Sequence, residues 1–290
     1  MWIGWILTSA VFLALYDLAK KASVKGNAVL PVLLVATLCG AAGYISVLGV
    51  AGGIAEALHP SAREFGLIGV KGLIVSTSWV LTYYALRTLP ITIATPIRAS
   101  APALVFVAAF FLYGEIPTWL QGLGMLLVFA GYWTFSWAGR HEGIDFLRNR
   151  AVWLAVGGMC MSALSSIWDK FILQRCAIPV ETVQFWFQID LVAIYATLLG
   201  AQHLFRLEKT RFVWRWTIPA VGLLLALADW LYFHGLAIPD VPISVGSLMR
   251  RFSVAITFVL GALFFHEANL KRKSIALAMI LAGIALLCLK

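Results

Sequence analysis

Charged residues are scarce in this 290-residue chain. They make up 12% of the sequence, whereas hydrophobic residues make up 62%. Soluble domains carry about 25% charged residues, because most of their surface must face water. So few charges cannot cover a soluble domain of this length. The composition therefore excludes a soluble globular protein and predicts that lipid surrounds most of the chain.

Sequence motifs of soluble enzymes and of metal sites are also missing. The sequence contains no phosphate-binding glycine loop, no His-Glu-x-x-His pattern and no plausible Ser/His/Asp set. Its four cysteines (Cys39, Cys160, Cys176 and Cys288) form no CxxC pair and lie within or at the edge of apolar runs. This placement favours buried thiols over disulfides or a metal site. We therefore expect no enzymatic activity, no cofactor and no metal.

The net charge of +9 comes from short basic clusters that lie between apolar runs and not along one polar face. In a membrane protein such clusters set the orientation and contact anionic headgroups. We therefore expect a lipid bilayer, and not nucleic acid, as the partner of these cations.

Long apolar runs fill nearly the whole sequence. A membrane-spanning helix needs about 20 mostly apolar residues, and these runs are too long and continuous for barrel strands. Ten runs approximately meet that length: 2–21, 30–53, 66–86, 91–113, 117–138, 151–172, 181–202, 214–236, 241–265 and 272–289. The predicted fold class is therefore an all-α membrane protein of ten transmembrane helices.

A shift of 152 positions brings residues that are rare inside apolar runs into register. The matched pairs are Asp17 with Asp169, Pro90 with Pro242, Arg98 with Arg250, and Glu115 with Glu267. The shift corresponds to five helices, and because five is odd, the second half must enter the membrane from the opposite side. The pattern predicts two inverted five-helix repeats, residues 1–140 and 141–290, in one integral membrane domain. Secondary transporters often have this architecture, with the substrate site near the midplane between the halves.

The ten spans, with Gly114-Glu115 and His266-Glu267 ending the fourth and ninth, resemble the ten-helix (EamA-like) branch of the drug/metabolite transporter superfamily. Its members are membrane exporters or exchangers of small metabolites. Two stretches, 97–102 and 244–251, are similar to segments of plastid triose-phosphate translocators, in which three cations hold the substrate phosphate. This resemblance implies an anion site at Arg98, Arg250 and Arg251. In the first stretch, Ala101 replaces an acidic residue common in that family.

These three arginines lie inside apolar runs, and no acid lies within four positions of any of them. A same-helix ion pair therefore cannot neutralise them. Guanidinium groups that face one cavity form a fork suited to phosphate or carboxylate, and Ser247, one turn before Arg251, can orient that side chain. The alternatives are that the arginines snorkel to an interface, or that they pair with Asp190 or Asp229 and only lock helices together. These two single acids suit either a counter-ion or a proton carrier.

Asp17 has two lysines, Lys20 and Lys21, at spacings of three and four, so the three side chains share a helix face and can neutralise one another. This cluster is either a self-paired helix end at the headgroups or part of a gating or proton-coupling site. Asp169 keeps the second possibility open, because the repeat places it at the position of Asp17.

Aromatic faces occur on the paired third and eighth helices. Tyr83 lies one turn beyond Trp79, and His234 lies one turn beyond Trp230. Most such aromatic residues pack in the bundle or form an interfacial belt. In the superfamily these helices usually line the cavity, so the resemblance implies that all four residues contribute to the substrate site.

The predicted function is a secondary active transporter that moves a small anionic, phosphorylated metabolite by alternating access, as a monomer or homodimer. One alternative is an exporter of neutral or cationic metabolites, such as aromatic amino acids or drugs. Another is a lipid-headgroup flippase. The connections after odd-numbered spans hold 14 lysines and arginines, with Lys20 and Lys21 counted after the first span. The even-numbered connections and the termini hold five, with Lys71 and Lys170 counted among them. The positive-inside rule then predicts that both termini lie outside the cytoplasm, in a bacterial inner membrane.

Overall fold

The computed structural model describes residues 2–50, 58–101, 103–105, 118–140, 144–206, 210–236, 250, 252–266 and 269–287. Within these ranges the chain forms ten α-helices and one π-helical turn, and no strand. The helices are α1 (Trp2–Val24), α2 (Val29–Val50), α4 (Ala62–Thr88), α5 (Ile91–Ala99), α7 (Trp119–Arg140), α8 (Arg150–Lys170), α9 (Val180–Leu204), α10 (Thr217–Leu236), α12 (Phe252–Phe265) and α13 (Leu270–Leu287). The all-helical architecture predicted from the hydropathy pattern is confirmed.

Several helices have the length and apolar character of membrane spans. By length and composition, α1, α2, α4, α8 and α9 each suffice to cross a bilayer, and shorter apolar helices lie at 91–105, 217–232 and 252–265. Large apolar side chains such as Leu126, Phe129 and Trp133 point outward from α7. A continuous exposed apolar surface of this kind is typical of contact with lipid or a partner.

Helix α4 begins four residues before its predicted start because its first turn is capped. The Ser61 hydroxyl accepts from the Glu64 N–H at 3.3 Å, and the Glu64 carboxylate accepts from the Ser61 N–H at 2.7 Å. This reciprocal capping box satisfies two backbone donors that a helix start otherwise leaves unpaired. The polar residues of this connection therefore belong to the helix.

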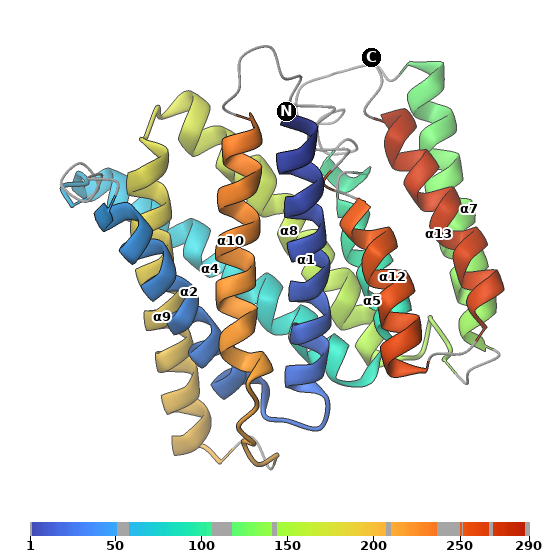
Figure 1. Ribbon diagram of the computed structural model, residues 1–290, viewed down its shortest axis with the longest axis horizontal. Helices are drawn as coiled ribbons and strands as arrows, with labels where there is room; N and C mark the ends of the chain where they lie inside the picture. The colour runs from blue at the N-terminus through green and yellow to red at the C-terminus, as the bar shows by residue number, and fades with distance from the viewer. Residues whose placement is uncertain are drawn as a thin grey trace.

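Helices from the two predicted halves alternate in space (Figure 1). The α2 and α9 helices lie together at one edge, α7 and α13 at the other, and α1 packs beside α10 in the middle. Each helix of the first half has a counterpart five helices further along the chain, such as α8 for α1. When every helix is replaced by its counterpart, the packed pair α1–α10 becomes α4–α8, α2–α10 becomes α4–α9, and α1–α12 becomes α5–α8, and all of these pairs are in contact. A twofold relation between the halves requires this exchange. The inverted sense of the repeat and its boundary near residue 140 stay predictions.

Small residues allow the closest helix crossings. A Cβ atom added to Gly222 of α10 would lie 2.6 Å from the Gly40 backbone nitrogen of α2. One added to Gly131 of α7 would lie 2.6 Å from Ile280 Cγ1 of α13. Close backbone approach at glycine is how membrane helices gain packing contacts without a hydrophobic driving force.

The α5 helix is short and contains Pro96, and its last turn carries Arg98. The Tyr132 hydroxyl of α7 donates to the Ile97 carbonyl at 3.1 Å, which satisfies a backbone acceptor next to Arg98. The predicted spans 91–113 and 241–265 are described only in part. Residues 106–113 and 241–249 lie outside the described ranges, as do Pro242, Glu115 and Glu267.

The three described cysteines are free thiols. Cys39 and Cys176 are half-buried, but Cys160 is exposed on α8, which corrects the expectation that it is buried. Cys288 lies outside the described residues.

Candidate substrate site

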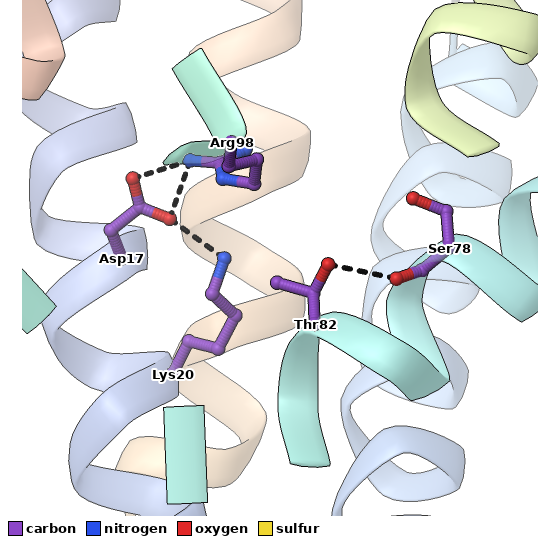
Figure 2. A network of polar contacts seen from close by, with 5 residues as sticks. All are labelled: Asp17, Lys20, Ser78, Thr82 and Arg98. Atoms are coloured by element: carbon purple, nitrogen blue, oxygen red, sulfur yellow. Dashed lines mark hydrogen bonds and ion pairs between the residues drawn. The ribbon is translucent and has the colours of Figure 1, made fainter. Parts of the chain in front are cut away.

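The Asp17 carboxylate lies between two cations in the interior of the bundle (Figure 2). Arg98 Nη2 donates to both of its oxygens, at 2.9 Å to Oδ1 and 2.6 Å to Oδ2. Lys20 Nζ donates to Oδ1 at 2.7 Å. The Asp17 side chain is 1% exposed and that of Lys20 2%, whereas that of Arg98 is 32% exposed. The pairing of Asp17 with Lys20 is as predicted, and both side chains are buried among the helices. A role for Asp17 in gating or proton coupling stays a prediction.

Two aromatic rings lie close to the Lys20 ammonium group. Its Nζ lies 4.4 Å from the Tyr16 ring centroid and 5.7 Å from that of Tyr83. Cations over aromatic faces are stabilised by the ring quadrupole, and more strongly where water is excluded. Tyr83 is 1% exposed and belongs to the buried core of the bundle.

Lys21 has a separate structural role one position along α1. It is buried, and its Nζ donates to the carbonyl oxygens of Leu86 and Leu89 at 2.6 and 2.5 Å. These two carbonyls lie at the end of α4, where a cation complements the helix dipole. Lys21 therefore connects α1 to the α4–α5 turn. These two hydrogen bonds go to backbone carbonyls and not to Asp17, which accepts from Lys20.

Arg250, just before α12, forms an ion pair with Asp229 of α10. Its guanidinium carbon lies 4.4 Å from the Tyr232 ring centroid. The Arg250 Nε is buried and has no hydrogen-bond partner among the described residues. Asp229 is thus a counter-ion to an arginine, as one of the sequence alternatives anticipates.

Asp190 pairs with neither arginine in the part of the chain that the structure describes. It packs against α4, where a Cβ atom added to Gly72 would lie 3.0 Å from Asp190 Cβ. Its Oδ2 is buried without a hydrogen-bond partner among the described residues. Its use as a proton carrier stays a prediction.

A cavity of about 540 Å³ is lined by both Arg98 and Arg250. Its walls come from α1, α4, α5, α8, α10 and α12, and thus from both predicted halves. Besides the two arginines, its polar and aromatic lining residues are Tyr16, Trp79, Ser162, Ser166, Tyr232 and Ser253. Among the described lining residues there is no acid. The Asp17 side chain is buried, whereas that of Asp229 is partly exposed but is not among these lining residues.

The structure brings three of the predicted site residues, Arg98, Arg250 and Trp79, to this cavity. Tyr83 and Trp230 do not line it. Tyr83 faces Lys20, and the Trp230 ring packs against Trp5 at 5.9 Å between centroids. The remaining predicted site residues are not covered: Ser247, Arg251 and the side chain of His234 lie outside the described residues.

Sequence reasoning missed five of the lining residues: Tyr16, Ser162, Ser166, Tyr232 and Ser253. Tyrosine and serine are common in membrane helices, and nothing in their local sequence marks them. The shift of 152 positions offers a partial signal for Tyr16, because its counterpart, Trp168, also lies one residue before a paired aspartate.

Another ion pair lies away from the cavity and joins the two predicted halves. Lys71 Nζ of α4 lies 2.5 Å from Asp169 Oδ1 of α8 and 4.8 Å from the Phe187 ring centroid of α9. The loop count places Lys71 in a connection between spans, which is wrong. It lies within α4, and its side chain is 7% exposed.

Comparison with known proteins extends the structural picture. A solved structure titled "Crystal structure of protein" has the same fold, with a TM-score of 0.64 over 97% of this chain and 94% of that chain at 20% sequence identity. No curated protein matches the chain. Residues 1–137 match the model of the EamA-like transporter family. Residues 1–137 are therefore similar to the EamA-like transporter family of the drug/metabolite transporter superfamily, and this similarity, together with the apolar helices, supports an integral membrane protein of the drug/metabolite transporter type.

Proposed function

We propose that the protein is a secondary transporter that moves a small anionic metabolite, in particular a phosphate ester, by alternating access. The observation that carries this proposal is the arrangement of charge around the cavity. Arg98 and Arg250 line it, while the carboxylates that pair with them do not. The charged groups in the described lining are therefore guanidinium groups.

The charges near Arg98 also leave a positive excess. One carboxylate, Asp17, serves two cations, Lys20 and Arg98, so the formal charge of the three groups is +1. On the other wall, the Arg250 Nε is a buried donor without an acceptor among the described residues. A buried donor without a partner is costly, and a phosphate or carboxylate oxygen supplies the acceptor that a guanidinium group prefers.

The lining also suits the organic part of such a metabolite. Tyr16, Trp79 and Tyr232 contribute aromatic surface, and the hydroxyls of Ser162 and Ser166 lie on the α8 wall. An exporter of cationic compounds would need an acid facing the substrate, and the described lining residues include none. For this reason the anion is the preferred substrate class.

Uptake into proteoliposomes tests the proposal. Purified protein is reconstituted, and uptake of labelled inorganic phosphate, a sugar phosphate, succinate, phenylalanine and tyramine is compared. Arg98→Gln and Arg250→Gln should each reduce anion uptake about 10- to 100-fold, the equivalent of a lost hydrogen bond to a charged group of about 1.5–3 kcal/mol. Arg148→Gln is the matched control, because Arg148 is 91% exposed at the surface.

Two results would contradict the proposal. The first is anion uptake by Arg98→Gln or Arg250→Gln at the wild-type rate. The second is transport of tyramine or phenylalanine, but of none of the anions, with loss of that transport in Asp229→Asn. That pattern would assign the cavity to neutral or cationic compounds.

A further inference from the structure

The two cavity arginines differ in what lies behind them. Arg250 is paired with Asp229 alone among the described residues, whereas Arg98 shares Asp17 with a second cation, Lys20. The Asp17 Oδ1 atom accepts from both cations, at 2.9 Å from Arg98 and 2.7 Å from Lys20. If Arg98 leaves, Asp17 therefore still has a partner.

Lys20 itself does not reach the cavity. It is absent from the described lining, its side chain is 2% exposed, and the rings of Tyr16 and Tyr83 lie close to its Nζ. The nearby α4 hydroxyls are engaged elsewhere: Ser78 donates to the Gly158 carbonyl and Thr82 to the Ser78 carbonyl (Figure 2). Asp17 is the acceptor for Lys20 in the described part of the chain.

Anion binding at Arg98 competes with Asp17 for the same guanidinium group. A buried carboxylate that loses its only cation is strongly destabilised, so without Lys20 the Asp17 carboxylate would hold Arg98 against the incoming anion. With Lys20 present, Asp17 stays paired when Arg98 turns into the cavity. The 32% exposure of the Arg98 side chain shows that one side of it is already open for this step.

We propose that Lys20 is a positioning residue that keeps Asp17 paired while Arg98 binds the anionic substrate. During transport, Asp17 then changes from pairing with both Lys20 and Arg98 to pairing with Lys20 alone. This inference rests on the proposed anion transport and adds to it a residue outside the cavity. In this account, Asp17 competes with the substrate for the Arg98 guanidinium group, and Lys20 weakens this competition.

Equilibrium binding of ³³P-labelled inorganic phosphate to the full-length purified protein tests the inference. Lys20→Met should raise the phosphate Kd tenfold or more, and Lys20→Arg, which keeps the cation, should leave it within threefold of wild type. In the double variant Asp17→Asn/Lys20→Met no carboxylate competes for Arg98. Its Kd should therefore return to the wild-type value or fall below it. A merely structural role for Lys20 predicts no such recovery.

Melting temperature and gel filtration show which variants fold. If Lys20→Met does not fold, phosphate binding by Asp17→Asn/Lys20→Met tests the inference instead. We expect this double variant to fold, because neither of its two replaced side chains is charged. Weakened phosphate binding in the folded double variant overturns the inference, and so does wild-type binding by Lys20→Met. In either case, the proposed function still stands if the wild-type protein binds phosphate and the Arg98→Gln variant does not. Wild-type protein that binds no phosphate overturns both.

Discussion

At the scale of single residues, the ion pair between Lys71 and Asp169 differs from the two pairs beside the cavity. Its lysine is buried in α4 and its aspartate is one-third exposed on α8. Neither residue lines the cavity. The pair therefore serves as a contact between the predicted halves, and its removal should act on stability before it acts on substrate binding.

Lys71→Met should lower the stability of the purified protein by about 2–3 kcal/mol, below the ~3–5 kcal/mol for breaking a fully buried pair because Asp169 is partly solvated. The double variant Lys71→Met/Asp169→Asn should recover most of this loss, since no uncompensated charge remains. Thermal unfolding in detergent measures both. If Asp169→Asn instead abolishes uptake with an unchanged melting temperature, Asp169 belongs to a gating or proton-coupling site.

The sequence predicts part of the candidate site, for a physical reason. An arginine inside an apolar run is expensive, so Arg98 and Arg250 stand out without any structure. The sequence also offers Asp229 as a partner, but it does not offer Asp17. Asp17 is 81 positions from Arg98 and has a nearer cation, Lys20, which explains it locally. Only the packing of α1 against α5 shows that one carboxylate serves both cations.

At the scale of helices, bilayer thickness makes the existence of spans predictable, whereas hydrogen bonds set their ends. The capping box of Ser61 and Glu64 extends α4 into residues that charge alone assigns to a connection. The loop count likewise assigns Lys21 to a connection. Lys21 instead lies in α1, its side chain is buried, and its Nζ donates to the Leu86 carbonyl near the end of α4. Such pairings depend on where neighbouring chain segments pack, which composition does not reveal.

The α2–α10 crossing allows a matched test of helix packing. Gly222→Ala places a methyl group against the α2 backbone near Gly40, with no room for it, and should destabilise the protein by about 1–3 kcal/mol, as overpacking does. Gly43→Ala is the control in the same interface, because its Cβ meets only Leu223 Cδ2, at 3.4 Å. Equal melting temperatures for the two variants would contradict this account.

At the scale of the whole molecule, each packed helix pair compared above has an equivalent pair when every helix is replaced by its counterpart in the other half. The ion pairs have no such equivalents. Asp17 binds Arg98, whereas their counterparts Asp169 and Arg250 bind Lys71 and Asp229 instead. In the first half, one carboxylate thus serves two cations. In the second half, Arg250 pairs with Asp229, and Asp169 pairs across the halves with Lys71. The 152-residue register predicts which residues correspond, but not this difference, because Lys71 and Asp229 have no charged counterparts in the other half: their register positions are Leu223 and Thr77.

The inverted repeat predicts opposite sides of the membrane for equivalent connections. His59, after the second span, and Arg211, after the seventh, are related by 152 positions, and both are exposed. The positive-inside rule predicts that Arg211 lies in the cytoplasm and His59 outside. In a variant without native cysteines, a membrane-impermeant thiol reagent should label His59→Cys in intact cells, and Arg211→Cys only after permeabilisation. Labelling of both from one side would refute the inverted repeat. The reverse pattern would keep the repeat and overturn the orientation, placing both termini in the cytoplasm.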